Sequence, residues 1–317
     1  MKRQIRYEPM PVKTMLNAVK APSMPFEQSI NPYRGCQHGC AFCYARSTHS
    51  FLGAEADDTF QNRIFLKTNA AEALKEQLEK MARSRKGIGG IGRIAIGTAT
   101  DPYQQVEAKA QLTRQCLEVL ADYPVPVSIT TRSPLILRDL DLLRRMPDVS
   151  VNISIGTLRT DIWRNFEPST PSPAKRLDTV RQLGQTGIPV GVFVAPILPF
   201  LSDGEEDLHS LIRALAEHRP EYVMSSFLRL STREVKVWFF HTLRELYPHL
   251  TETYAALYNG TSSAPESYRH PLRHKIRQWL VQYGLRDSES VRLAAKPQPD
   301  DSACSTAGPA VQQLYLF

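Results

Sequence analysis

Three cysteines near the start of the chain constrain it more than any other feature. Cys36, Cys40 and Cys43 fall within eight residues of the stretch NPYRGCQHGCAFCYAR. Their CxxxCxxC spacing places three thiolates on one short loop, and a cluster of four irons held by three thiolates keeps one iron free to bind another molecule. A closed structural zinc site would require a fourth protein ligand. The spacing therefore favours an iron–sulfur site.

Two other interpretations of the cysteines stand beside this one. Either His38 or His49 supplies the fourth ligand of a zinc knuckle, or the cysteines are core residues that happen to be close. Gly35 and Gly39 argue against coincidence, because glycine lets a backbone wrap closely around a large inorganic group. The motif is a hypothesis until a strand is found to lead into the loop.

The motif resembles the signature of the radical S-adenosylmethionine (radical SAM) superfamily, in which an aromatic residue precedes the last cysteine. Phe42 holds that place here. The resemblance implies a [4Fe–4S] cluster on the three cysteines, whose open iron binds the amino and carboxylate groups of SAM. It also implies an electron donor protein, because reduction of the cluster cleaves SAM to a 5′-deoxyadenosyl radical.

The composition agrees with a cytoplasmic enzyme. With 317 residues, 42% of them hydrophobic, the chain is long enough for one large domain with appendages. Five cysteines, three of them clustered, do not suggest a disulfide framework, which indicates a reducing compartment. No apolar stretch follows the basic N-terminus, and the longest apolar run, Val190 to Leu201, has twelve residues and two prolines. We therefore expect no signal peptide and no membrane span.

The charge gives a weak hint about partners. The net charge is +7 and the pI is near 9.2. Such an excess suits an anionic partner such as nucleic acid.

Strand and helix patterns alternate along most of the chain. Short β-prone runs predict strands, and apolar residues at helical spacing predict the helices between them. Asn69 with Glu72 predicts a capping box at the first helix. Repeated strand–helix units imply a parallel sheet with right-handed crossovers. The fold class is therefore α/β, and six such units resemble the partial (β/α)6, TIM-like barrel of radical SAM enzymes. The predicted strands are Arg63–Lys67, Arg93–Gly97, Val127–Thr131, Val149–Gly156, Val190–Ala195 and Glu221–Leu230.

The same patterns predict three parts of the chain. Residues 1–231 form the radical SAM partial barrel. Residues 232–286 form a small helical subdomain, because two helical patterns, around Trp238–Tyr247 and Ile276–Tyr283, follow the last strand. Residues 287–317 begin with a stretch rich in Ser, Ala, Pro and Asp, which predicts a flexible, disordered tail.

One loop after a predicted strand carries many polar residues. In a parallel barrel the chemistry lies at the carboxyl ends of strands. The strand RIAIG is followed by GTATDPYQQVEAK, which contributes Thr98, Thr100, Asp101 and Tyr103. Asp101 is equally suited to an ordinary role as a cap before the turn at Pro102. The loop is therefore a candidate binding segment, and its Asp101 is either a binding residue or a cap of the turn.

This loop and its context resemble the spore photoproduct lyase-like branch of the superfamily, and within it the DNA photolyase-like radical SAM proteins. The resemblance runs from about Ile30 to Leu230. The stretches that carry it are NPYRGCQHGCAFCYAR, GTATDPYQ, TTRSPLILRDLDLL, NFEPSTPSPAKR and GIPVGVFVAPILP.

One position departs from the lyase pattern. The lyase has a cysteine near the end of the strand motif that returns a hydrogen atom to the substrate radical, and Thr98 holds the corresponding place here. Cys116 lies on the apolar face of a predicted helix, where a buried and inert thiol is usual. Tyr44 and Tyr103 are then the candidate hydrogen relays, although a tyrosine near a cluster more often has a packing role.

The resemblance also implies residues that bind SAM. Arg132, at the end of the third predicted strand, stands where the family places a basic residue for the methionine carboxylate. Ser154 ends the fourth strand and is a candidate for the amino-acid or ribose portion; Glu167 is a candidate for ribose or substrate. For Arg132 and Ser154 the alternative is a solvated strand-end residue. Arg176 is expected to pack or to pair with Glu167. The candidate cofactor-binding set is Phe42, Thr98, Thr100, Asp101, Arg132, Ser154 and Glu167.

The last five residues, QLYLF, resemble the QLxLF peptide by which bacterial polymerases and repair proteins bind the sliding clamp. A short apolar peptide at the end of a flexible linker can enter a hydrophobic groove without disturbing the folded domain. The expected clamp contacts are Gln313, Leu314, Leu316 and Phe317. The alternative is that the peptide packs against its own barrel.

Together these patterns predict a radical SAM enzyme that acts on nucleic acid, in DNA repair or modification, with lyase-type repair among the possible reactions. One alternative is a radical SAM enzyme of a protein or small metabolite, which a lack of DNA or clamp binding would favour. The other is a non-catalytic iron–sulfur or zinc protein, which a lack of SAM cleavage would favour.

Overall fold

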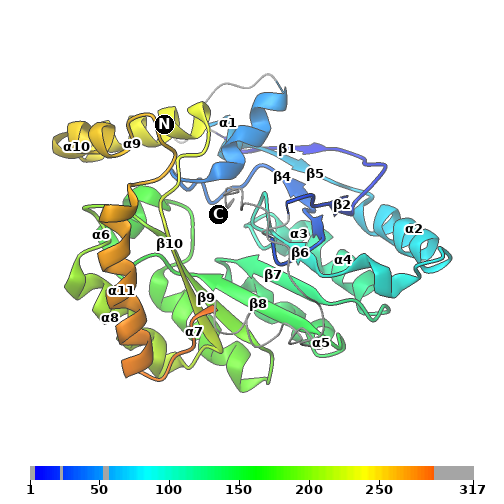
Figure 1. Ribbon diagram of the computed structural model, residues 1–317. Coiled ribbons are helices and arrows are strands. Elements are labelled where there is room, and N and C mark those ends of the chain that lie inside the picture. Colours follow the sequence, from blue (N-terminus) through cyan, green and yellow to red (C-terminus); the bar gives the residue numbers. More distant parts are fainter. Residues whose placement is uncertain (1–3, 22–23, 53–56, 289–317) are drawn as a thin grey trace, which may run out of the picture.

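A sheet of mostly parallel strands organises the chain, with helices along its outer side (Figure 1). The computed structural model describes residues 4–21, 24–52 and 57–288, so the QLYLF peptide and nearly all of the predicted tail lie outside the described residues. The side chain of His49 also lies outside them. In spatial order the strands of this sheet are β10 (Tyr222–Phe227), β9 (Val190–Ile197), β8 (Val149–Ser154), β7 (Val127–Thr131), β6 (Ile94–Ile96), β3 (Gln28–Ile30) and β2 (Asn17–Ala18).

The parallel strands follow one another in chain order from β3 to β10, and only β2, at the edge, runs antiparallel to its neighbour. Helical segments connect each strand to the next, as expected for a partial (β/α)6 barrel. Between β3 and β6 lie η1 (Tyr44–Leu52), α1 (Thr59–Asn62), α2 (Ala70–Ala82) and η2 (Ile88–Ile91). The later connections contain α3 (Glu107–Ala110), α4 (Leu112–Leu120), η3 (Pro134–Asp139), α5 (Leu140–Leu143), α6 (Thr160–Phe166), α7 (Pro173–Gln185) and α8 (Glu205–His218).

The first strand of the barrel differs from the prediction. Arg63–Lys67 was expected to be that strand, and a strand does form there as β5 (Arg63–Leu66), but it belongs to a separate sheet with β1 (Arg6–Pro9) and β4 (Tyr33–Arg34). The barrel begins instead with β3, which reads QSI and has only one apolar residue to mark it as a strand in the sequence. Because β3 leads almost directly to the cysteines, they follow the first strand of the barrel, which is the context that the motif requires.

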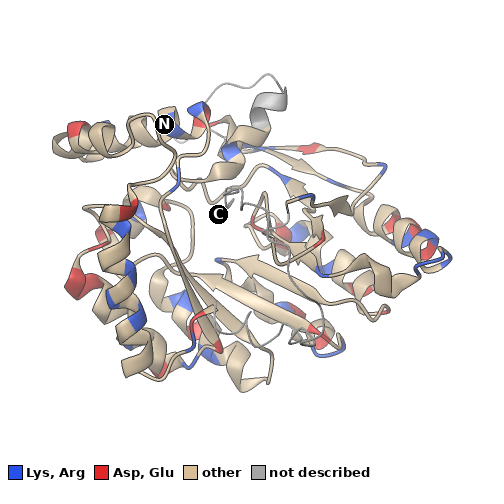
Figure 2. Cartoon of the chain, in the orientation of Figure 1, with Lys and Arg blue, Asp and Glu red and all other residues tan. Residues whose placement is uncertain are grey.

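The main core lies between the sheet and the outer helices. Leu74 and Leu78 of α2 are fully buried, as are Leu117 and Leu120 of α4. Full burial of a leucine side chain contributes about 1.5 to 3 kcal/mol to folding. Lys, Arg, Asp and Glu lie mainly on the outer helices and loops, whereas the central strands carry few of them (Figure 2). The sheet is therefore covered by helices whose charged faces meet solvent.

A second core cluster joins the segment that follows the barrel to the cysteines. Cys40 and Phe42 pack in one cluster with residues of α6, α9 (Arg233–Leu246) and α10 (Thr251–Leu257). The rings of Phe166 and Phe239 stack with centroids 5.6 Å apart. Helix α11 (Glu266–Gln282), which follows η4 (Pro248–Leu250) and α10, instead contributes Ile276 to the main core. The predicted division of the chain at residue 231 stays a prediction.

The start of α2 corrects a detail of the prediction. The helix begins at Ala70, but the Asn69 side chain does not cap it. Asn69 instead accepts a hydrogen bond from the Val12 amide at 2.8 Å and donates one to the Val12 carbonyl at 2.9 Å. The side chain thus holds the N-terminal segment against the barrel. Across the described residues, none of the helices is long and apolar enough to cross a membrane.

Gly97 directly follows β6 and is expected to tolerate no side chain. Its φ is +95°, and a Cβ atom there would lie 2.4 Å from the Thr130 carbonyl oxygen and 2.8 Å from Pro102 Cδ. We predict that Gly97→Ala lowers the free energy of unfolding by at least about 2 kcal/mol in urea denaturation. The control is Gly184→Ala in α7, where a Cβ meets nothing within 4 Å. That change should raise stability by about 0.5 to 1 kcal/mol, and equal effects of the two variants would contradict the prediction.

Candidate active site

The cysteine loop, residues 35–43, turns tightly enough to bring its three thiols to one end of the barrel. Gly35 has a φ of +84°, and a Cβ atom there would lie 2.7 Å from the Arg63 carbonyl oxygen. Backbone bonds from the Gly39 amide to the Cys36 carbonyl, 3.3 Å, and from the Cys43 amide to the Cys40 carbonyl, 3.2 Å, close two successive turns. Gly39 is also in the left-handed region, with a φ of +64°. Both glycines are therefore required by the backbone.

The three thiols fit the donor set of a cluster. All are free, Cys36 and Cys40 are buried, and Cys43 is half-buried. Burial raises the pKa of Cys36 and Cys40, so a cationic partner such as iron is needed to hold them as thiolates. Among the described residues, no three His, Cys, Asp or Glu side chains meet closely enough to bind one metal ion. In a four-iron cluster each cysteine binds a different iron, so its ligands do not need to converge on one point.

Arg46 binds the backbone of the cysteine loop. The sequence alone did not identify this residue. It is 5% exposed, and it donates hydrogen bonds to the Cys40 carbonyl at 3.2 Å and the Gly39 carbonyl at 3.1 Å. Its guanidinium lies 4.3 Å from the ring centroid of Trp238 on α9. Burial lowers the pKa of Arg46 to about 10. The side chain therefore couples the cysteine loop to α9.

Thr100 and Gln104 attach the cysteine loop to the loop after β6. Thr100 donates a hydrogen bond to the Gly35 carbonyl at 2.7 Å, and Gln104 donates to the same oxygen at 3.2 Å. The Gln104 side chain also accepts from the Gln37 amide at 2.9 Å. Thr100 was a predicted cofactor contact, and the structure uses its hydroxyl to hold the backbone beside Cys36. Gln104 was missed because a buried glutamine has no distinguishing pattern in a sequence.

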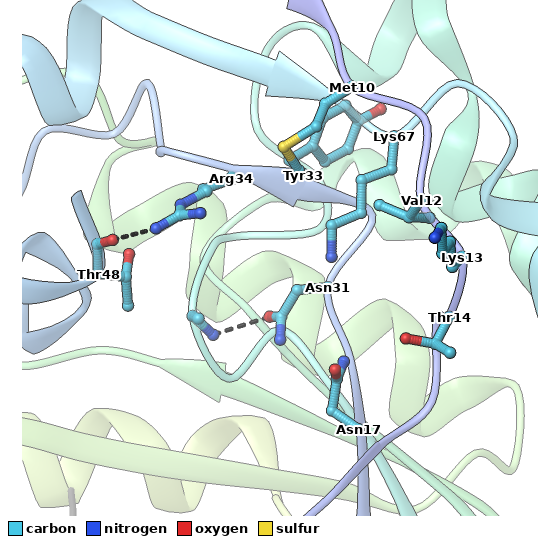
Figure 3. A pocket seen from close by; sticks show the side chains of 11 residues that line it. Met10, Val12, Lys13, Thr14, Asn17, Asn31, Tyr33, Arg34, Thr48 and Lys67 are labelled. Atoms are coloured by element: carbon cyan, nitrogen blue, oxygen red, sulfur yellow. Dashed lines mark hydrogen bonds between the residues drawn. The ribbon is translucent and has the colours of Figure 1, made fainter. Parts of the chain in front are cut away.

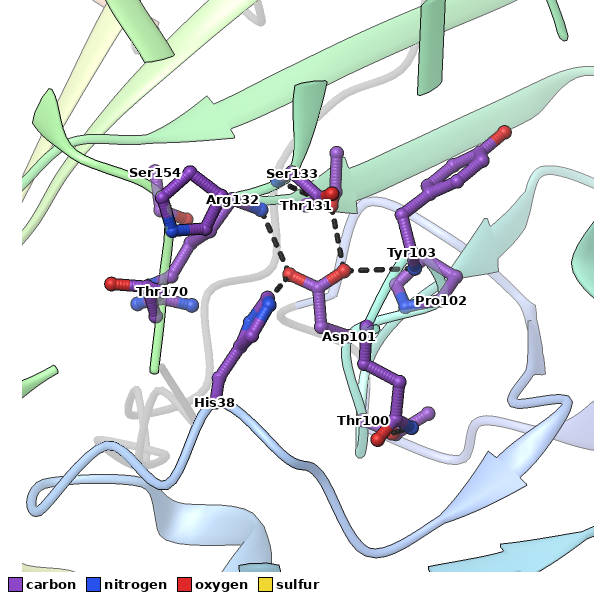
Figure 4. A network of polar contacts seen from close by, with 12 residues as sticks. His38, Thr100, Asp101, Pro102, Tyr103, Thr131, Arg132, Ser133, Ser154 and Thr170 are labelled. Atoms are coloured by element: carbon purple, nitrogen blue, oxygen red, sulfur yellow. Dashed lines mark hydrogen bonds and ion pairs between the residues drawn. The ribbon is translucent and has the colours of Figure 1, made fainter. Parts of the chain in front are cut away.

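The Asp101 carboxylate connects three segments of the site (Figure 4). One oxygen accepts from the Thr131 hydroxyl at 2.6 Å and the Tyr103 amide at 2.9 Å. The other accepts from the Arg132 amide at 2.8 Å and lies 3.2 Å from His38 Nδ1. The structure shows the local turn with Tyr103 and a contact that joins β7 to the cysteine loop, and a role of Asp101 in cofactor binding stays a prediction. Burial alone raises the pKa of this carboxyl, but His38, Thr131 and the Arg132 amide lower it to about 2.

Glu167 and two arginines form a second buried group. Arg176, 1% exposed, lies 2.6 Å from the Glu167 carboxylate and donates to the Ser154 carbonyl at 3.0 Å. The predicted pairing of Arg176 with Glu167 is thereby confirmed. Arg132 Nε lies 3.3 Å from the same carboxylate without forming a hydrogen bond to it. Burial raises the pKa of Glu167, and the charges of Arg176 and Arg132 outweigh it, so the pKa is lowered.

Arg132 lies against the cysteine loop. Its guanidinium is 5.9 Å from the ring centroid of Phe42, and 21% of its side chain is exposed. Burial lowers the pKa of Arg132, but its neighbours Cys40 and Glu167 raise it, and the net direction is upward. Ser154, 4% exposed, ends β8 beside these residues, with its carbonyl bound to Arg176. The predicted residues Phe42, Arg132, Ser154 and Glu167 are thus brought together.

Thr98 and Tyr44 meet at the edge of the same site. The Tyr44 hydroxyl donates a hydrogen bond to the Thr98 carbonyl, and the Thr98 hydroxyl accepts one from Asn31 at 3.0 Å. Asn31 also accepts from the Ala99 amide at 2.8 Å. Tyr44 is 37% exposed, whereas burial of its hydroxyl raises the pKa of that group. Asn31, which follows β3, is a further site residue that the sequence did not single out.

Tyr103 and Cys116 lie in the core. Tyr103 is 1% exposed, and its ring points away from His38 and Asp101 (Figure 4). It packs in the main core with Cys116, which is fully buried on α4, as predicted for an inert thiol. Burial raises the pKa of Cys116 to about 12. The position of Tyr103 is that of a packing residue, so it does not join the site.

The pKa of Asp101 predicts a dependence of stability on pH. An unfolded aspartate has a pKa near 3.8, so the lowered folded pKa stabilises the fold above that pH, and the contribution is lost as the pH falls toward 2. The difference corresponds to about 2 kcal/mol. We predict that Asp101→Asn lowers the free energy of unfolding of the iron-free protein at neutral pH by about 1 to 3 kcal/mol.

This loss should shrink as the pH is lowered from 4 to 2, measured by urea denaturation at each pH. The control is Asp122→Asn, an exposed carboxylate paired with Arg145 at the surface. A loss that is the same at every pH would show that the charge of Asp101 contributes nothing.

Comparison with known proteins places this site in a family. The model of the Radical SAM superfamily matches residues 30–212. An uncharacterized protein of Mycobacterium tuberculosis is 34% identical over 280 residues, which are 86% of this chain and 79% of that protein. A protein of Pseudomonas phage M6 described as a radical SAM Nα-GlyT isomerase is 24% identical over 268 residues, 82% of this chain and 53% of its own length.

A solved structure agrees in fold. A mutant spore photoproduct lyase with bound AdoMet and dinucleoside spore photoproduct aligns with 87% of this chain and 78% of its own, with a TM-score of 0.65 and 18% sequence identity. The chain has the fold of that protein, and with a family match over more than half its length it belongs to the radical SAM superfamily, whose members use a [4Fe–4S] cluster and SAM.

Proposed function

We propose that this radical SAM enzyme acts on nucleic acid, in DNA repair or modification. The observation that carries the proposal is the fold match over 87% of the chain to a lyase whose structure holds a dinucleoside spore photoproduct. The phage relative, a radical SAM Nα-GlyT isomerase, supports radical SAM chemistry at a similar scaffold. The net charge of +7 is of the sign that attracts a polyanion.

In this proposal Cys36, Cys40 and Cys43 hold the cluster. When bound and reduced, the cluster supplies the electron that cleaves SAM to methionine and a 5′-deoxyadenosyl radical, the species that takes a hydrogen atom from the substrate. Arg132 binds the methionine carboxylate, a charge-assisted contact worth about 1.5 to 3 kcal/mol. Ser154 and Glu167 line the ribose side, while Phe42 packs under Arg132 and Asp101 fixes the backbone of Arg132.

The return of the hydrogen atom requires a residue other than Thr98. An alcohol O–H bond is stronger than the C–H bond that it would form, whereas a phenol O–H bond is weaker, so a tyrosine can donate where a threonine cannot. Tyr44 is hydrogen-bonded to the Thr98 carbonyl and partly exposed, which supports it as the relay. Tyr103 is withdrawn because its ring lies in the core.

The cluster and the SAM reaction are tested by two matched cysteine variants. We predict that the protein reconstituted anaerobically binds about four irons per chain and, with SAM and dithionite, forms 5′-deoxyadenosine. Cys43→Ala should lose both iron and activity, whereas Cys116→Ala, which changes a core thiol on α4, should keep both. Stoichiometric zinc without sulfide in the anaerobically purified wild-type protein would overturn the cluster assignment.

The substrate class is tested in the same reaction. DNA, undamaged or irradiated, should increase the rate of 5′-deoxyadenosine formation, and mass spectrometry of the digested DNA should find an altered nucleoside. If peptides or small metabolites increase the rate and DNA does not, the enzyme belongs to the first alternative class. If no SAM is cleaved under any condition, a non-catalytic role stands.

We further propose that the terminal peptide QLYLF binds a sliding clamp and that a cytoplasmic electron donor protein reduces the cluster. The clamp proposal rests on sequence alone, because residues 313–317 lie outside the described part of the chain. A preceding linker of about 25 residues with a Ser- and Pro-rich composition spans roughly 25 to 30 Å, enough to reach a partner while the barrel stays free.

Deletion of residues 313–317 is therefore predicted to abolish binding to the clamp of the host, measured by surface plasmon resonance, and to leave SAM cleavage unchanged. Leu316→Ala with Phe317→Ala should have the same effect, because these side chains are the apolar anchors. If the full chain does not bind the clamp, or if the deletion unfolds the barrel, the peptide has a structural role instead.

A further inference from the structure

A basic pocket opens beside the proposed site, and none of the roles assigned above uses it. It has a volume of about 350 Å³ and lies between the N-terminal segment, the residues that follow β3, and Lys67, which follows β5 (Figure 3). The residues that line it are Met10, Val12, Lys13, Thr14, Asn17, Asn31, Tyr33, Arg34, Thr48, Lys67 and Ala99. Three of them are cations, and no Asp or Glu is among these described lining residues.

Among the described residues, no carboxylate forms an ion pair with Lys67 or Arg34 of this pocket. The ammonium of Lys67 points into the space between Asn31 and Arg34 (Figure 3). Within the described part of the chain, Arg34 donates a hydrogen bond to the Thr48 carbonyl, which is uncharged. Burial lowers the pKa of Lys67; Cys116 opposes this shift and the charge of Arg34 adds to it. Two like charges directed into one polar space are relieved by an anion.

The wall of the pocket is held in place before any ligand binds. Asn69 fixes both the amide and the carbonyl of Val12. Gln77 of α2 accepts hydrogen bonds from the amides of Met15 and Leu16, the latter at 2.9 Å. These contacts explain why Asn69 does not cap its helix. A preformed wall lowers the entropy lost when a ligand binds.

The pocket adjoins the place where the reaction is expected. Asn31 lines it and binds both Thr98 and the Ala99 amide. Thr98 also accepts the hydrogen bond of Tyr44 at the edge of the candidate site, so a substrate held in the pocket has its neighbouring part next to Thr98. The volume exceeds that of a phosphate group and is within the range of pockets that hold small ligands.

We propose that this pocket binds a backbone phosphodiester of the nucleic acid substrate and so positions the neighbouring nucleotide at the site. Lys67 and Arg34 contact the phosphate oxygens, and Thr14 offers a hydroxyl at the rim. Met10, Val12 and Ala99 supply an apolar side for the sugar. The inference rests on the proposed function, because it takes the substrate to be nucleic acid.

The test compares two lysine variants of the full chain. Binding of a fluorescein-labelled single-stranded oligonucleotide is followed by fluorescence anisotropy at several salt concentrations. Lys67→Gln should weaken binding about three- to tenfold and reduce the slope of log K against log salt by about 0.7, as expected when one phosphate contact is lost. Lys75→Gln removes the same charge from an exposed site on α2 and should change binding less than about twofold.

A third variant separates charge from folding. Lys67→Arg keeps the cation and should retain binding within about twofold of wild type. A loss of binding in Lys67→Gln but not in Lys67→Arg is then assigned to the lost charge. If Lys67→Gln binds the oligonucleotide as wild type does, the pocket proposal is wrong while the proposed function stands. If the wild type itself binds no nucleic acid and no DNA is altered in the SAM reaction, the proposed function fails first.

Two further measurements distinguish other anions that share this chemistry. Inorganic phosphate, compared with chloride at equal ionic strength, should compete only weakly with the oligonucleotide. Strong competition would assign the pocket to free phosphate and overturn the proposal. Likewise, a loss of SAM affinity in Lys67→Gln as large as its loss of oligonucleotide affinity would assign the pocket to the SAM carboxylate.

Discussion

The site depends on the carboxylate of Asp101, because it is the point at which separate barrel segments are joined. Its two oxygens accept hydrogen bonds from the end of β7 and from its own turn, and they face His38 of the cysteine loop. A buried carboxylate with several donors is stable as an anion, and removing the carboxylate leaves its donors unsatisfied. The positions of Arg132 and of the cysteine loop are therefore set together.

The surroundings of the cysteines show why the sequence predicted the chemistry better than the geometry. The CxxxCxxC spacing is local, so the ligands were found without a structure. Gln104 and Asn31 act over long sequence separations, through a backbone carbonyl and a backbone amide, and Arg46 reaches back to the carbonyls of Gly39 and Cys40. No recurring spacing marks such residues in a sequence. Tyr103 shows the opposite limit, because a polar residue in a site loop can turn its ring into the core, which the sequence pattern does not reveal.

The fold was likewise predicted where a local sequence pattern marks an element, and missed where contacts between distant segments decide the pairing. The strands β6 to β10 are recognisable from their β-prone residues, and the helices between them have clear periodicity. The first barrel strand escaped because β3 reads QSI, with one apolar residue, whereas the equally short β6 reads IAI. The strand β5, which looks like a barrel strand, pairs with β1 instead. Strand pairing is decided by contacts between distant segments, here by the N-terminal residues, and not by the pattern within the strand.

The arginines around the cysteines differ in how much binding capacity they retain. Arg46 is committed to backbone carbonyls and Trp238, and Arg176 is committed to Glu167 and the Ser154 carbonyl. Arg132 keeps part of its surface open and has an Nε without a hydrogen bond. Because Arg176 already balances Glu167, Arg132 can turn to a new carboxylate without leaving a buried charge unpaired. Of these three described side chains, it alone can bind an anionic ligand at little cost to the fold.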